Sequence, residues 1–194
     1  MYEIPTSILI GEQSFPVRNK GDFRMVLDCF AALEDIELTK QERIVASLII
    51  FYDGMETLED LTRFDDIETA VKEMYRFFNC GRIDDNTRVP PYRLIDWEQD
   101  EQMICSAINK ITNKEIRFEP YIHWWTFMGF YTAIGESLLS TVIGIREKII
   151  TGKKLEKYET KFRLHNPQYF IWNAKTLEEQ EAEAEIMSLW NAGE

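Results

Sequence analysis

Residues 121–150 read YIHWWTFMGFYTAIGESLLSTVIGIREKII, and this aromatic-rich stretch decides the fold. In its first half, large side chains recur at spacings of three and four residues, which is typical of one face of a helix. The candidate core residues on that face are Trp124, Phe127, Tyr131 and Ile134. Other large side chains lie off this face, so the helix is apolar almost all round and needs packing partners on several sides. The stretch therefore predicts a helical core that also supports protein binding.

Two interruptions define the limits of this stretch. Pro120 is expected at the first helical position, where its missing amide hydrogen would have had no partner in any case. The run Gly135, Glu136, Ser137 is expected to break or kink the helix before a second apolar stripe continues toward Gly152. The uncharged part, residues 124–135, is well short of the roughly 20 residues that cross a bilayer. No transmembrane helix is predicted.

Further helices are indicated on the N-terminal side of the stretch. Thr39 and Glu42 match a capping box, in which the two side chains satisfy exposed amides at a helix start. Another helix is expected to begin near Asp65 or Asp66. A further one is expected near Asp96, with Gln99 three residues further on and Trp97 in its apolar stripe. After the stretch, a charged helix is expected over residues 155–164.

The chain is predicted to be mainly α, with a compact helical domain and a small N-terminal β-hairpin. Residues 8–10 and 14–17 form two short apolar runs around a Gly11–Glu12 turn, and Pro16 limits the second run to an edge strand. The expected organisation is a hairpin appendage at 1–20, a helical core domain at 21–165 and an acidic C-terminal tail at 166–194. For the tail, a docking helix and a frayed terminal helix are open alternatives.

The charge of the chain argues against polyanionic partners. A net charge of −12 and a pI of about 4.7 repel nucleic acids and anionic membranes on average. The best candidate for a basic patch alternates with glutamates, as on a solvated helix face. Its members are Arg146, Lys148, Lys153, Lys154, Lys157, Lys161 and Arg163. We expect no nucleic-acid partner and no membrane partner.

The N-terminus and the cysteines indicate an intracellular protein. No basic flank followed by a long apolar core is present at the N-terminus, so a secretory signal is not predicted. Cys29, Cys80 and Cys105 are widely spaced in apolar helical contexts and lack a CxxC pair. They are expected to be reduced core residues.

Motifs for catalysis and metal binding are not found. The two histidines, His123 and His165, lack the spacings of a zinc site. The acidic groups at 84–86 and 96–101 lack the glycine turn and distal glutamate of a calcium loop, so they are interpreted as turn and helix-start residues. No phosphate-binding glycine loop and no nucleophile elbow occurs. The prediction is a protein without catalytic residues, metal or cofactor.

Candidate partner-binding residues lie in the aromatic stretch and in the last 30 residues. Tryptophan and tyrosine are enriched at the centres of protein interfaces, because a rigid ring buries a large area at little entropic cost. The candidates are Trp125, Phe130, Trp172, Met187 and Trp190.

The run from Tyr92 through Asp100, and above all the sequence His123, Trp124, Trp125, Thr126, Phe127, resembles one known family. This is the gene-product-fifteen family of bacteriophages, found in Gram-positive siphophages and their prophages. The resemblance covers roughly residues 38–163.

The resemblance implies a tail assembly chaperone, encoded beside the tape-measure protein, that acts in the host cytoplasm. Such proteins bind the hydrophobic tape-measure protein, recruit major tail protein subunits and form homo-oligomers. The family supplies no catalytic residues. The alternative is a minor tail or connector protein that stays in the virion.

Overall fold

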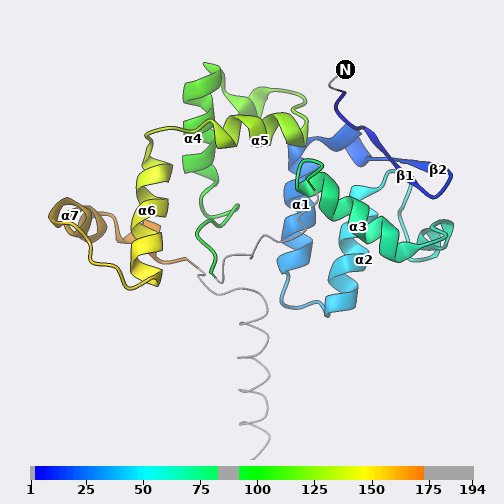
Figure 1. Ribbon diagram of the computed structural model, residues 1–194, viewed down its shortest axis with the longest axis horizontal. Helices are drawn as coiled ribbons and strands as arrows, with labels where there is room; N and C mark the ends of the chain where they lie inside the picture. The colour runs from blue at the N-terminus through cyan, green and yellow to red at the C-terminus, as the bar shows by residue number, and fades with distance from the viewer. Residues whose placement is uncertain (1–2, 83–91, 173–194) are drawn as a thin grey trace, which may run out of the picture. The chain divides into compact units, whose positions relative to one another are not determined.

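The computed structural model describes residues 3–82 and 92–172. It is mainly α with one small two-stranded sheet near the N-terminus, which confirms the predicted fold class (Figure 1). The chain forms two compact units: Met1–Thr87 with Glu119–Gly129, and Arg88–Phe118 with Phe130–Glu194. The boundary between the units thus falls inside the predicted domain at 21–165, and the division proposed from the sequence stays a prediction.

The first unit begins with the predicted hairpin. Strand β1, Ser7–Ile10, pairs antiparallel with β2, Gln13–Pro16, in a register that sets Ile8 opposite Phe15. Gly11 has a φ of +60° in the connecting turn, a conformation that glycine adopts without steric cost. Ile8, Ile10 and Phe15 are buried, so one face of the hairpin belongs to the core of this unit.

Three helices complete most of the first unit: α1, Phe23–Glu34; α2, Lys40–Phe51; and α3, Ile67–Phe78. The capping box at α2 is present as predicted: Thr39 N–H donates to Glu42 Oε2 at 2.9 Å, and Glu42 N–H donates to Thr39 Oγ1 at 3.3 Å. Asp66 caps α3 through the amides of Glu68 and Thr69. Short 3-10 turns, Arg18–Gly21 and Glu59–Arg63, connect these elements.

Aromatic rings fill the centre of the first unit. Phe15, Phe51 and Tyr52 are among its largest buried side chains. The Tyr52 ring contacts Phe15, Phe51 and Phe64 with centroids 4.8 to 6.1 Å apart, in edge-on arrangements that aromatic pairs prefer. The Tyr52 hydroxyl donates to Ala70 O at 2.9 Å, so the buried polar group has a partner.

The second unit is built on two helices that pack together: α4, Glu101–Thr112, and α6, Leu138–Ile150. A capping box of Ser137 and Ser140 starts α6 after the predicted break at 135–137. The second unit also contains helix α7, Lys157–His165, and two 3-10 turns, Ile116–Phe118 and Pro167–Phe170. Helix α5, Trp124–Thr132, starts in the first unit and ends in the second.

The predicted start of α4 was wrong. Asp96 does accept the amides of Glu98 and Gln99, but these bonds close a single turn, and the helix begins at Glu101 with Asp100 as its N-cap. The carboxylate of Asp100 is bonded to Arg146 and to the amide of Asp96, which holds residues 96–100 as a turn. Trp97 therefore precedes the helix, where its ring contacts Tyr131.

The predicted role of Pro120 was also wrong. The chain after it stays extended, because the Ile122 amide donates to Asp22 Oδ2 at 2.9 Å and the Ile122 carbonyl accepts from Phe23 N–H at 2.9 Å. The helix begins four residues later, at Trp124. Within residues 3–82 and 92–172, no helix is long and apolar enough to cross a membrane.

Candidate functional site

His123 fixes the start of α5. Its side chain is 2% exposed, its Nδ1 accepts the Trp125 N–H at 3.0 Å, and its Nε2 lies 3.0 Å from Pro5 O. A carbonyl oxygen can only accept, so the neutral tautomer with hydrogen on Nε2 satisfies both contacts. Burial lowers the pKa of His123 below its usual value, while the Pro5 carbonyl and Asp22 oppose that shift. The ring thus acts as a neutral helix cap.

The two following tryptophans bind the end of α3. Trp124 Nε1 donates to Phe78 O at 2.8 Å, and Trp125 Nε1 donates to Phe77 O at 2.9 Å. Phe78 is the last residue of α3, so Trp124 satisfies a carbonyl that has no partner within the helix. Phe77 O also accepts the Cys80 N–H at 3.0 Å, so Trp125 adds a second donor there. The run His123–Trp124–Trp125 consequently ties α5 to Pro5 and to α3 through three ring nitrogens.

Gly81 allows the close approach of Trp125. Its φ is +78°, and a Cβ added to it would lie 3.0 Å from Cη2 of Trp125. Any larger residue would strain the backbone and press on the indole. The absence of a side chain at Gly81 is therefore part of what lets Trp125 pack against the end of α3.

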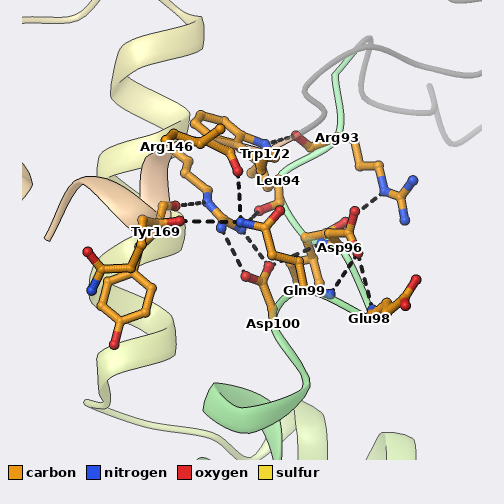
Figure 2. Close-up of polar contacts among 12 residues, drawn as sticks. Arg93, Leu94, Asp96, Glu98, Gln99, Asp100, Arg146, Tyr169 and Trp172 are labelled. Atoms are coloured by element: carbon orange, nitrogen blue, oxygen red, sulfur yellow. Dashed lines mark hydrogen bonds and ion pairs between the residues drawn. The ribbon is translucent and has the colours of Figure 1, made fainter.

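Arg146 and Asp100 form a buried ion pair in the second unit (Figure 2). Arg146 has no exposed side-chain area, and its Nη1 and Nη2 donate to the two carboxylate oxygens of Asp100 at 2.5 and 2.9 Å. Nη1 also donates to Leu94 O and Nε to Tyr169 O, both at 2.9 Å. Such a forked arrangement is the strong form of an arginine–carboxylate contact.

The same cluster holds the segment that leads into the C-terminal tail. The Arg146 guanidinium lies 4.8 Å from the Trp172 ring centroid, and Trp172 Nε1 donates to Arg93 O at 2.9 Å. Gln99 Nε2 donates to Ile171 O at 2.8 Å. Figure 2 shows these residues converging from α6, from the segment that precedes α4 and from residues 169–172. We use the name Arg146 cluster for the side chains of Arg146, Asp100, Gln99 and Trp172 together with the backbone carbonyls that they bind, at Arg93, Leu94, Tyr169 and Ile171.

Two members of the best candidate for a basic patch, which was interpreted as a solvated helix face, form ion pairs. Arg146 is buried in an ion pair, and Lys148 Nζ is 2.7 Å from Glu159 Oε1. Arg146 is therefore withdrawn from the surface, whereas the Lys148 side chain stays 33% exposed. Asp100, interpreted from the sequence as a helix-start carboxylate, is in addition the ion-pair partner of Arg146.

The candidate core residues divide between the two units. Trp124 and Phe127 are buried in the first unit, and the Phe127 ring stacks on Phe23 with centroids 4.4 Å apart. Tyr131 and Ile134 are half-buried in the second.

The candidate partner-binding residues are less uniform. Trp125, Phe130 and Trp172 are half-buried, and the indoles of Trp125 and Trp172 already donate to backbone carbonyls of the chain. Met187 and Trp190 lie outside the described residues. Sequence reasoning missed Phe118, which is 87% exposed and the most exposed of the large apolar side chains in the described part. Its place in an unremarkable polar stretch carried no signal.

The cysteines are free thiols. Cys29 and Cys105 are buried as expected, whereas Cys80 is half-buried. Burial raises the pKa of Cys29 far above its usual range, so this thiol stays protonated and unreactive. Among the residues that the structure describes, no group of three or more His, Cys, Asp or Glu side chains is arranged to hold a metal ion. The acidic group at 84–86, interpreted from the sequence as turn residues, lies outside this part.

These features define a mainly helical protein of two compact units. In the first unit the run His123–Trp124–Trp125 contacts backbone carbonyls, and in the second unit Arg146 and Asp100 form a buried ion pair. The chain belongs to the bacteriophage Gp15 protein family, whose model matches residues 3–170. The matched range includes the run His123–Trp124–Trp125 and the ion pair of Arg146 and Asp100, and the match confirms the resemblance to this family seen in the sequence. No curated protein and no solved structure matches the chain. It is thus a phage structural or assembly protein.

Proposed function

We propose that this protein is a tail assembly chaperone that binds the tape-measure protein in the host cytoplasm, without catalysis. The proposal extends the family assignment with the resemblance noted in the sequence. In this role the protein self-associates along the tape measure, recruits major tail protein subunits and leaves before the virion is complete.

The observation that carries the proposal is that three large apolar side chains of the second unit are strongly exposed. Phe118, Leu164 and Ile171 are 87%, 74% and 76% exposed, although the chain has a net charge of −12. Where exposed apolar side chains lie together they mark a protein-binding surface, and these three are the candidates for such a surface in the second unit. A reversible holder of apolar helices combines these two properties: its charge keeps the complex dispersed, and its exposed apolar side chains bind the client.

Co-expression with the tape-measure protein tests the proposal. The tape-measure protein should be mostly soluble with the wild-type chain and mostly insoluble without it. Phe118→Asp should lower the soluble fraction severalfold, because a carboxylate at the contact must be desolvated. Leu58→Asp is a matched control, since Leu58 is 67% exposed in the first unit.

Two results would contradict the proposal. A tape-measure protein that is equally insoluble with and without the chain excludes chaperone activity. Stoichiometric amounts of the chain in purified mature particles would instead establish the rival function of a minor tail or connector component. Circular dichroism of each variant checks that the fold is kept.

A further inference from the structure

Helix α7 presents a basic face to solvent. Lys157, Lys161 and Leu164 follow one another at spacings of four and three residues, so they lie on one side of the helix. All three are exposed, and Tyr158, also exposed, lies beside them. We call these four residues the α7 face. It combines two cations with an aliphatic and an aromatic side chain.

The glutamates that alternate with these lysines in the sequence do not neutralise the α7 face. Glu159 is 4% exposed and points away, where it accepts Lys148 Nζ at 2.7 Å and the Glu156 N–H at 2.7 Å. Glu156 precedes the helix. In the described part of the chain, neither Lys157 nor Lys161 forms an ion pair. The sequence pattern suggested a balanced surface, but the structure leaves it positive.

The last residues that the structure describes, up to Trp172, follow a turn that packs on the Phe162 side of α7. The Phe162 and Phe170 rings lie 6.2 Å apart, so the 3-10 turn Pro167–Phe170 packs on α7. The Arg146 cluster then holds Tyr169 and Trp172. From Trp172, the thirteen steps to Glu185 span at most about 45 Å, roughly three times the ~14 Å length of α7. The tail can therefore reach either lysine.

We propose that the α7 face binds the chain's own C-terminal segment, residues 178–190. This segment contains five glutamates followed by four large apolar residues. They are Glu178, Glu179, Glu181, Glu183 and Glu185, then Ile186, Met187, Leu189 and Trp190. The carboxylates pair with Lys157 and Lys161, and the apolar residues cover Leu164 and Tyr158.

Tethering favours the chain's own tail over the tail of a second copy. A short covalent connection gives the two partners an effective concentration on the order of millimolar. Exposed ion pairs are individually weak and screened by salt, so the contact is reversible. A partner that uses the α7 face must compete with the tail, which gives the segment a regulatory role.

The test uses the full-length protein labelled with 15N. In the wild type, amides of residues 178–190 should show heteronuclear NOE values above those of a free chain terminus. They should fall to free-chain values in the variant Lys157→Glu/Lys161→Glu, and in about 0.5 M NaCl, where the Debye length is only ~4 Å. Lys153→Glu/Lys154→Glu is the matched control: it makes the same charge change at two exposed lysines before the helix.

A charge swap separates pairing from unfolding. Adding Glu181→Lys/Glu185→Lys to Lys157→Glu/Lys161→Glu should restore the high NOE values, while unchanged shifts of buried amides in α6 show that the fold is intact. Equal tail signals in the wild type and in Lys157→Glu/Lys161→Glu would overturn the proposal. So would an equal loss in the control. An effect that disappears on dilution would assign the α7 face to a second copy.

Discussion

Arg146 lies within an apolar helical stripe, between Ile145 and Ile149, and its charge is satisfied entirely inside the second unit. Its partner Asp100 is 46 residues away in the sequence. Local patterns locate a charge on a helix, but they do not tell which distant carboxylate meets it. For this reason the sequence placed Arg146 among the candidates for a basic patch, whereas the structure shows it in a buried ion pair.

Arg146→Met should destabilise the second unit by about 3–5 kcal/mol, because it leaves the Asp100 carboxylate buried without its counter-charge. Arg146→Met/Asp100→Leu should recover much of that loss, since no uncompensated charge remains. Hydrogen exchange of α4 and α6 amides measures both effects. Arg163→Met, at an exposed arginine, is the control and should change the exchange rates little. Equal losses in the single and double variants would show that the pair is not the stabilising feature.

At the scale of elements, the sequence predicted helix starts well where the capping residues bind only each other. The capping box of α2 is confirmed, because both partners lie on the same turn. The starts of α4 and α5 were wrong for a common reason: a residue far along the chain binds the expected cap region. Arg146 binds Asp100, and Asp22 binds the amide of Ile122.

Helix α5 should weaken in acid through His123. Burial lowers the pKa of this ring below about 6.5, so the unfolded chain takes up the proton more readily than the folded one. The contribution of the neutral His123 ring to the free energy of unfolding is complete above pH 6.5. It declines as the pH falls from 6.5 toward the lowered pKa, by at most about 1.4 kcal/mol per pH unit.

Urea denaturation across this pH range measures the effect. His123→Asn should remove this part of the pH dependence, because an asparagine can cap a helix without titrating there. His165→Gln, at an exposed histidine, should retain it. A His123→Asn protein with the same pH dependence as the wild type would show that the group responsible lies elsewhere.

At the scale of the whole molecule, charge is the dominant property. A net charge of −12 disperses the chain at neutral pH, and this repulsion disappears near the pI of about 4.7. Composition alone determines this behaviour. By contrast, the distribution of charge over the surface depends on the fold, since Arg146 and Glu159 are turned inward.

Self-association should therefore peak near pH 4.7 and fall again on either side, as measured by light scattering at constant ionic strength. Raising the salt at pH 7 should increase scattering modestly, because screening removes part of the repulsion. Scattering that stays flat between pH 4 and pH 7, both rough limits of the window, would indicate that charge does not control dispersal.

The sequence by itself determined the class of fold, the hairpin, the break between α5 and α6, and the family. Each of these depends on periodicity, turn chemistry or a short uncommon run such as His123–Trp124–Trp125, and such signals are local. Only the tertiary structure decided that the three rings of this run bind backbone carbonyls, that Arg146 meets Asp100, and that Glu159 leaves the lysines of α7 unbalanced. These contacts join residues far apart in the sequence, and the energy that selects them comes from burial, which no local pattern records.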